Sequence, residues 1–256
     1  MTQGYDIRLI APSGYPHNPN AMARGIARLE EAGHTVQGKD VLERRELRFA
    51  GSDAERAADI NGLADVSRPL PDVALAIRGG YGAHPLLPLL DYDGLRDRLG
   101  EAPIALVGHS DFTALQCALF ARSGLVTLGG PMLGADFGAP ELDARTWEHF
   151  WATLAADEGR ASWNTPDGRA LDVEGTIWGG NLAMLTSLVG SPFFPEIDGG
   201  ILFIEDIAEP AYRVERMLYH LFHAGVLARQ KVLVVGDFTS YRTTEYDNGY
   251  DLDTTF

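Results

Sequence analysis

Short apolar segments without polar alternation constrain the fold of this chain more than any other feature. Three of them occupy residues 8–11, 73–77 and 104–107 in the first half of the chain. Each is followed by glycine or serine turn residues, and amphipathic, helix-like segments separate them. Strands that are apolar on both faces and alternate with helices are typical of a parallel sheet covered by helices on both sides. The segments therefore predict an α/β fold, in which ligands bind beyond the carboxyl ends of the strands.

A change in local residue composition divides the chain into two predicted domains. Between residues 156 and 170, polar and turn-forming residues replace the apolar segments, and we interpret this stretch as a linker. The parallel-sheet domain then spans residues 1–155, and a smaller α/β domain spans residues 171–256. In the smaller domain the apolar segments 201–204 and 232–235 are predicted strands, with an amphipathic helix between them.

Composition narrows the classes of function that the chain can have. With 36 acidic and 21 basic residues the net charge is −15, which disfavours binding to nucleic-acid phosphates or to anionic membranes. No apolar stretch approaches the ~20 residues of a membrane span, and the first residues lack the pattern of a secretory signal. The single cysteine, Cys117, excludes an intrachain disulfide. We therefore expect a cytoplasmic protein without nucleic-acid or membrane partners.

One strand end carries a candidate nucleophile. The strand predicted at 104–107 runs into Gly108, His109 and Ser110, and a helix-like segment begins near Phe112. A serine on such a sharp strand-to-helix turn has the geometry of a nucleophile elbow, with helix N–H groups close to the reacting atoms. The match is partial, because Phe112 stands where the pattern G-x-S-x-G has its second glycine. The alternative interpretation is a serine that only caps the helix.

A glycine loop at the neighbouring strand end supplies candidate oxyanion donors. Gly79 and Gly80 follow the strand predicted at 73–77, and glycine lets the main chain approach a ligand closely. An oxyanion hole needs two N–H donors. One could come from Gly79 or Gly80, and Asp111, which follows the candidate nucleophile, could supply the other. The alternative is a tight turn without a catalytic role.

The smaller domain contributes an acidic pair, Glu205 and Asp206, directly after the strand predicted at 201–204. A catalytic serine needs a base, and the base needs an orienting acceptor, which a carboxylate at this strand end could be. The alternative is that the pair only caps the helix that leads to Arg213.

The histidines do not identify the base. None of them follows a predicted strand of the smaller domain; the seven are His17, His34, His84, His109, His149, His220 and His223. His220 and His223 lie three residues apart on one helix without a convergent third ligand, so no metal site is predicted.

Collinear segments over nearly the whole chain resemble the LD-carboxypeptidase family, which also contains the microcin C immunity peptidases. The resemblance is strongest to the muramoyl-tetrapeptide carboxypeptidases of that family. The segments that carry it are LIAPSGY (9–15), GIARLEEAGH (25–34), RRELRFAG (44–51), AIRGGYGA (76–83), VGHSDFTALQ (107–116), GPML (130–133), EGTIWGGNLAML (174–185), ILFIEDI (201–207), YRVERML (212–218), HAGVL (223–227) and GDF (236–238).

The resemblance implies an activity and roles for particular residues. These enzymes resemble serine hydrolases with a Ser-Glu-His triad, and they release the terminal D-Ala from murein tetrapeptides during cell-wall recycling. By position, Ser110 is the nucleophile and Glu205 is the triad glutamate. The resemblance also implies oxyanion donors in the Gly79–Gly80 loop and at Asp111, and an N-terminal domain like that of class I glutamine amidotransferases. We expect a cytoplasmic homodimer that needs no metal or other cofactor.

The resemblance also implies that part of the second domain is missing. The family's triad histidine lies in a G-H motif after a further helix and strand, and the chain ends at Phe256 before that point. The domain 171–256 is therefore expected to be incomplete. Three functions stay open: the LD-carboxypeptidase, a serine peptidase of the microcin C immunity type, and a catalytically incomplete remnant that binds muropeptides.

Four residues are candidates for contacts with a substrate that carries a terminal carboxylate. Arg78 and Arg213 suit a carboxylate, because a guanidinium can bind one through two parallel hydrogen bonds. Trp178 could wall the cleft, and Asn181 could form a hydrogen bond with the substrate. The alternatives are an ion pair of Arg213 with Glu209 or Glu205, a buried anchor between the domains at Trp178, and a helix cap at Asn181.

Overall fold

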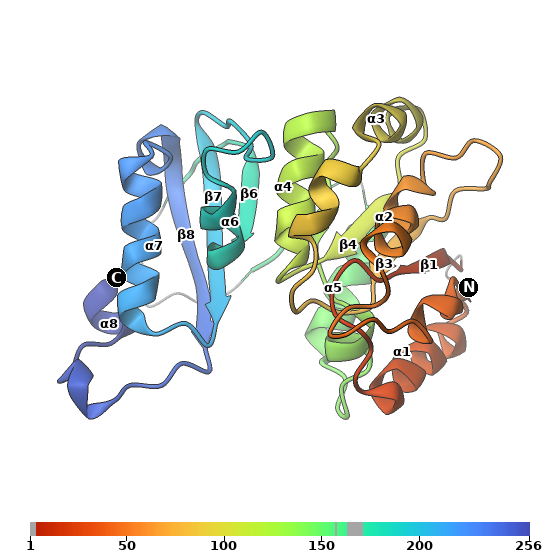
Figure 1. Ribbon diagram of the computed structural model, residues 1–256, viewed down its shortest axis with the longest axis horizontal. Coiled ribbons are helices and arrows are strands. Elements are labelled where there is room, and N and C mark those ends of the chain that lie inside the picture. The colour runs from red at the N-terminus through yellow and green to blue at the C-terminus, as the bar shows by residue number, and fades with distance from the viewer. Residues whose placement is uncertain (1–3, 157, 163–170) are drawn as a thin grey trace. The chain divides into compact units, whose positions relative to one another are not determined.

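The structure is a computed structural model that describes residues 4–156, 158–162 and 171–256. The chain forms two compact units, Met1–Gly168 (unit 1) and Arg169–Phe256 (unit 2) (Figure 1). The boundary between them lies inside the stretch 156–170 that we interpret as a linker. Residues 157 and 163–170 of that stretch lie outside the described residues. Each unit has a sheet of its own, so the two are described separately.

Unit 1 contains a five-stranded sheet in the order β2-β1-β3-β4-β5, in which every neighbouring pair is parallel. Its strands are β1 (Asp6–Ile10), β2 (Thr35–Gln37), β3 (Val73–Ala76), β4 (Ala105–Gly108) and β5 (Leu128–Gly129). All four residues of the central strand, β3, are buried, as a strand covered on both faces requires. The predicted α/β fold with a parallel sheet is therefore confirmed.

Helices connect these strands, and local signals explain where several of them begin. The helices are α1 (Pro19–Glu31), α2 (Asp53–Asn61), α3 (Tyr92–Glu101), α4 (Phe112–Ser123) and α5 (Ala144–Ala155), with shorter helical turns η1 (Lys39–Leu42), η2 (His84–Leu89) and η3 (Leu133–Phe137). α1 begins behind Asn18, whose side chain accepts a hydrogen bond from the N–H of Ala21. α2 begins with a reciprocal capping box between Ser52 and Glu55.

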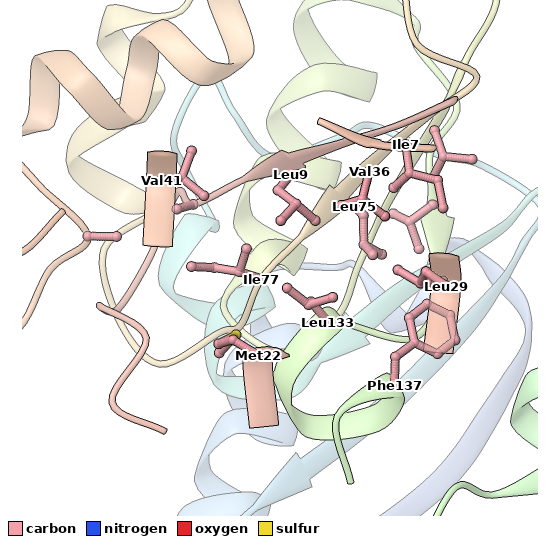
Figure 2. Packing of buried hydrophobic residues seen from close by; sticks show 14 of the residues in the cluster. Ile7, Leu9, Met22, Leu29, Val36, Val41, Leu75, Ile77, Leu133 and Phe137 are labelled. Carbon is pink, nitrogen blue, oxygen red and sulfur yellow. The ribbon is translucent and has the colours of Figure 1, made fainter. Parts of the chain in front are cut away.

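One apolar core joins the sheet of unit 1 to α1, η3 and α5. Leu9 and Leu75 from the strands, Leu29 from α1 and Leu133 and Phe137 from η3 are buried in this cluster. Figure 2 shows their side chains gathered in one layer beside the strands. Burying a side chain of this size contributes about 1.5–3 kcal/mol. A tightly packed core therefore stabilises the strands that precede the candidate site residues.

Unit 2 contains a three-stranded parallel sheet in the order β6-β7-β8. Its elements are β6 (Ile177–Asn181), α6 (Leu182–Leu188), β7 (Gly200–Ile207), α7 (Ala211–His223), η4 (Leu227–Arg229), β8 (Gln230–Thr239), η5 (Glu245–Asp247) and α8 (Leu252–Thr255). The strand predicted at 201–204 is present but continues to Ile207. Glu205 and Asp206 therefore lie inside β7 rather than after it, which corrects the prediction.

Candidate active site

The turn after β4 holds Ser110 in a conformation that few residues other than glycine adopt. β4 ends at Gly108 and α4 begins at Phe112, so three residues connect them. Ser110 has a φ of +61°, in the left-handed region, which costs an L-residue about 1 kcal/mol. The N-cap residue of α4 is Asp111, so the alternative that Ser110 only caps this helix is wrong. Such backbone strain occurs most often at functional sites.

Gly79 lies directly against the Ser110 side chain. A Cβ atom on Gly79 would be 3.0 Å from Oγ of Ser110 and 3.5 Å from the backbone N of Asp111. Within the described part of the chain, no acceptor binds the backbone N–H groups of Gly79, Gly80 or Asp111. The glycine loop and the Ser110 turn are therefore in contact, and the role of these N–H groups as oxyanion donors stays a prediction.

The buried side chain of Asp111 connects its own turn to two other loops by hydrogen bonds. Its Oδ2 atom accepts hydrogen bonds from Oγ of Ser13 (2.6 Å) and from the N–H of Ala83 (2.9 Å). Its Oδ1 atom is buried without a hydrogen-bond partner among the described residues. Burial raises the pKa of Asp111, although both hydrogen bonds favour the charged form. The carboxylate thus connects the β4–α4 turn to the loops that follow β1 and β3.

A fully buried arginine, Arg56 on α2, contacts the loops that follow β1 and β3. Its guanidinium donates to the carbonyl oxygens of Pro12 and Gly82, each at 2.6 Å, and pairs with Asp53. The guanidinium carbon also lies 4.7 Å from the centre of the Phe49 ring. Removing a buried partner of this kind would leave backbone carbonyls unpaired, so Arg56 is a strong constraint on both loops.

Arg78 follows β3 and lies beside the glycine loop, as the sequence predicts. Its Nε atom donates to the carbonyl oxygen of Gly79, and Nη1 donates to that of Tyr15, each at 3.1 Å. Nη1 also contacts Nδ1 of His17. Burial, together with the nearby charge of Arg48, lowers the pKa of Arg78. Contact of Arg78 with a substrate stays a prediction.

His109, the neighbour of the candidate nucleophile, is directed to another partner. Its Nε2 atom lies 3.1 Å from Oδ2 of Asp136, which also accepts a hydrogen bond from the N–H of Met132. Among the residues that the structure describes, no histidine forms a hydrogen bond with the Ser110 hydroxyl. The structure of unit 1, like the sequence, therefore assigns no general base.

In unit 2, the two acidic residues of β7 have different surroundings. Glu205 is half-buried and lies opposite Asn181 of β6 in the sheet register. Asp206 is buried and accepts hydrogen bonds from Nδ2 of Asn181 (2.8 Å) and from the N–H of Ala183 (2.9 Å). The N-cap residue of α7 is Pro210, so the alternative that the acidic pair caps this helix is wrong.

The three predicted substrate contacts of unit 2 all have partners within that unit. Arg213 forms an ion pair with Glu209 at 3.6 Å, and Nε1 of Trp178 donates to Oε1 of Gln230 at 2.9 Å. Asn181 caps α6, because its Oδ1 atom accepts from the N–H of the third residue of the helix. The ion pair of Arg213 and the helix cap at Asn181 are the structural roles that the alternatives predicted, and contact with a substrate stays a prediction.

Comparison with known proteins identifies the family. The family model of the LD-carboxypeptidase N-terminal domain matches residues 7–130, and that of the LD-carboxypeptidase C-terminal domain matches residues 174–255. The chain belongs to the LD-carboxypeptidase family. The predicted resemblance is confirmed, and the first match contains the Ser110 turn and the glycine loop while the second contains Glu205.

Three members of this family show how far the similarity extends. The crystal structure of muramoyltetrapeptide carboxypeptidase from Oxalobacter formigenes is 42% identical, with a TM-score of 0.88, covering 98% of this chain and 82% of that one. The murein tetrapeptide carboxypeptidase of Pseudomonas aeruginosa is 32% identical over 77% of this chain and 65% of its own length. The microcin C7 self-immunity protein MccF of Escherichia coli is 30% identical over 85% of this chain and 70% of its own length.

Three other features of the chain bear on its chemistry. No three histidine, cysteine, aspartate or glutamate side chains in the described ranges are grouped so that they could hold a metal ion. The free thiol of Cys117 is buried on α4, and burial raises its pKa to about 12, so it is protonated and unreactive at neutral pH. No helix in the described part of the chain is long and apolar enough to cross a membrane.

One residue that holds the site together, Arg56, was not predicted from the sequence. Arg56 lies among alanines and acidic residues on α2, where a charged side chain normally predicts a solvent-exposed face. Its spacing of four residues from the buried Ile60 was the available signal that it lies on the inner face. Ser13 lies at the carboxyl end of β1, where the strand-end rule for ligand sites points.

Proposed function

We propose that this chain is a serine-type LD-carboxypeptidase that releases the terminal D-Ala from murein tetrapeptides. The observation that carries the proposal is the Ser110 turn, which has a positive φ and is in contact with the glycine loop at Gly79. Relatives named murein tetrapeptide carboxypeptidase and muramoyltetrapeptide carboxypeptidase support the choice of substrate. The scissile bond joins an L-configured centre of the third residue to D-Ala.

Ser110 is the nucleophile of the proposed reaction. Its Oγ atom attacks the carbonyl carbon before D-Ala, and the carbonyl oxygen becomes an oxyanion. The N–H groups of Gly79 and Asp111 bind that oxyanion, and the first turn of α4 adds the positive end of its dipole. The C–N bond then breaks, D-Ala leaves with an added proton, and water hydrolyses the acyl-enzyme.

Glu205 is the orienting acid of the proposed triad. In the Ser-Glu-His triad that the family resemblance implies, the histidine takes the proton of the serine and passes it to the amine of the departing D-Ala, while the carboxylate fixes the orientation of the imidazole. The family resemblance supports this role for Glu205, and its place in β7 keeps the carboxylate half-exposed. The same resemblance supports a cytoplasmic homodimer that acts in peptidoglycan recycling without a cofactor.

The test is to incubate purified protein with the murein tetrapeptide and to measure released D-Ala by mass spectrometry. We expect D-Ala and tripeptide as products, and Ser110→Ala should lower kcat by at least about 1,000-fold without unfolding the protein. Ser240→Ala is the matched control, because Ser240 is the other described serine with positive φ (58°). Equal activity of Ser110→Ala and Ser240→Ala would contradict the assignment of the nucleophile.

A second candidate function is a serine peptidase of the microcin C immunity type. The similarity to MccF favours it, and a structure of MccF holds glutamyl sulfamoyl guanosine. Cleavage of an aminoacyl sulfamoyl nucleoside with a higher kcat/KM than that of the tetrapeptide would establish this alternative. A third outcome, in which the tetrapeptide binds without release of D-Ala, would indicate a catalytically incomplete muropeptide-binding protein.

A further inference from the structure

Three arginines of unit 1 contact Tyr15, in the loop after β1, two of them through the guanidinium group and one through its backbone carbonyl. The guanidinium carbon of Arg45 lies 4.3 Å from the centre of the Tyr15 ring. The carbonyl oxygen of Arg48 accepts a hydrogen bond from the N–H of Tyr15 at 3.1 Å. Arg78 donates from Nη1 to the Tyr15 carbonyl oxygen at 3.1 Å. Arg45 and Arg48 lie on one loop, 43–52, and Arg78 lies on the loop after β3, so two loops contribute the three arginines. The guanidinium carbon of Arg48 itself lies 5.8 Å from the centre of the Tyr81 ring.

Ion pairs among the described residues do not neutralise the charges of these three arginines. No carboxylate of the described residues forms an ion pair with Arg45, Arg48 or Arg78, although the chain carries 36 acidic and only 21 basic residues. Arg45 and Arg48 lie over tyrosine rings instead, which position the guanidinium groups without neutralising them. The charge of Arg48 also contributes to the lowered pKa of Arg78, so the like charges act on each other.

Backbone contacts fix this arginine cluster next to the candidate nucleophile. The N–H of Gly14 donates to the carbonyl oxygen of Gly79 at 3.3 Å, and Gly79 is in contact with Ser110. A tight hairpin closed by mutual hydrogen bonds between Glu46 and Phe49 carries Arg48. The cluster thus lies at the carboxyl edge of the sheet, where parallel α/β domains bind their ligands.

We propose that Arg45, Arg48 and Arg78 form an anion subsite that binds a carboxylate of the peptide substrate beside Ser110. The proposal rests on the proposed carboxypeptidase function, because a murein tetrapeptide carries several carboxylates near the scissile bond. A guanidinium group binds a carboxylate through two parallel, charge-assisted hydrogen bonds. An incoming carboxylate would also neutralise three like charges that have no described acidic partner.

The test replaces each arginine in turn by glutamine, as Arg45→Gln, Arg48→Gln and Arg78→Gln. Kd for the murein tetrapeptide is measured by titration calorimetry in Ser110→Ala protein, and KM and kcat are measured in the unsubstituted background. We expect each substitution to raise Kd and KM by about tenfold or more, with a smaller effect on kcat. Arg78 also supports backbone carbonyls, so thermal unfolding must show which variants fold.

Arg122→Gln is the matched control. The guanidinium carbon of Arg122 lies 5.8 Å from the Tyr92 ring centre, the same distance as that of Arg48 from the Tyr81 ring centre. Arg122 is exposed in the last turn of α4, at the end of that helix opposite Ser110. The control therefore loses a charge and a ring contact of the same kind, and we expect its Kd and KM to stay unchanged.

Two modified peptides identify which carboxylate the subsite binds. One has a C-terminal amide in place of the D-Ala carboxylate, and the other has lysine in place of a third-residue diamino acid that carries a side-chain carboxylate. The peptide without the recognised carboxylate should bind about tenfold more weakly to the unsubstituted arginines. It should also be insensitive to the arginine substitutions, because the interaction is then already absent.

Each outcome separates the subsite from the proposed function. If Arg45→Gln and Arg48→Gln bind the tetrapeptide as tightly as Arg122→Gln does, the subsite is refuted whether or not Arg78→Gln folds. Arginine-dependent binding without release of D-Ala supports the subsite and refutes the carboxypeptidase function of this chain. Release of D-Ala with a KM that the arginine substitutions do not change supports the carboxypeptidase function and refutes the subsite. Failure both to bind and to cleave the peptide refutes both proposals.

Discussion

Two strand-to-helix junctions, one that contains Ser110 and one that follows the strand of Glu205, look alike in sequence and differ in structure. In each, four apolar residues come near the end of the strand and a helix follows. Each junction spans three residues, 109–111 after β4 and 208–210 after β7. Each also contains one non-glycine residue with positive φ, which is Ser110 in the first and Ala208 in the second.

The difference lies in how the functional side chain is presented. Ser110 occupies the strained position itself, so buried contacts of Asp111 and Arg56 must hold its turn in place. Glu205 lies inside β7, where pairing with the neighbouring strand determines which face it occupies. Because side chains alternate along a strand, Asp206 faces the opposite side and is buried. Substitutions at the two junctions should therefore fail in different ways.

Glu205→Gln tests whether the second junction serves catalysis. Glutamine keeps the shape of the side chain but loses the charge that would orient an imidazolium. We expect kcat for release of D-Ala to fall by about 1,000-fold or more, while the urea midpoint of unfolding stays unchanged. An undiminished kcat would remove Glu205 from the proposed triad and leave it a sheet residue.

Gly79→Ala tests how tightly the first junction is built. The new Cβ atom would lie 3.0 Å from Oγ and Cβ of Ser110, so the serine or the glycine loop must move away. We expect kcat to fall by about 100-fold, as when one oxyanion donor is lost. Gly100→Ala on α3 is the control, because no heavy atom lies within 4 Å of its Cβ position. Its kcat should match that of the unsubstituted protein.

Asp206→Asn separates the two acids of β7 from each other. The buried carboxylate accepts hydrogen bonds from Asn181 and from the N–H of Ala183, and an amide can accept fewer of them. We expect a loss of about 1–3 kcal/mol in the free energy of unfolding, measured with urea. Glu205→Gln should lose less than about 0.5 kcal/mol. A larger loss for Glu205→Gln would contradict the assignment of the two faces.

The smallest expected effect is on the pH dependence of stability at the first junction. Burial raises the pKa of Asp111 above its value in the unfolded chain, although Ser13, Ala83, His84 and Arg56 all favour its charged form. The folded protein then binds the proton more tightly than the unfolded chain does. The free energy of unfolding therefore falls as pH rises from about 4 through the raised pKa. Asp111→Asn should make this fall shallower.

Asp143→Asn is the control of opposite sign for the pH measurement. The hydrogen bonds from Thr146 lower the pKa of Asp143, so its stabilising contribution is lost as pH falls. Asp143→Asn should therefore weaken the loss of stability on the acid side and leave the fall above about pH 4 as it is. Parallel pH profiles for the two variants would show that Asp111 titrates as an ordinary exposed acid.

The first junction could be predicted from the sequence better than the second. A strand-to-helix turn with serine is a local feature, so residues 104–112 were enough to place Ser110 and the N–H of Asp111. The predicted end of β7 was wrong, because the acidic pair gives no sign that pairing with β8 extends the strand to Ile207. That pairing includes a register irregularity between Ile204 and Asp206, which depends on the partner strand.

The amino-acid order was sufficient for features that depend on neighbours in the chain. These are the alternating strands and helices, the strand-end loops of unit 1 and the position of the candidate nucleophile. The buried hub of Arg56, Ser13 and Asp111 and the arginine cluster around Tyr15 could not be found in this way. Ser13 lies 98 residues from Asp111, Arg56 lies 44 from Pro12 and Arg78 lies 63 from Tyr15, and only the parallel sheet brings these loops to one edge.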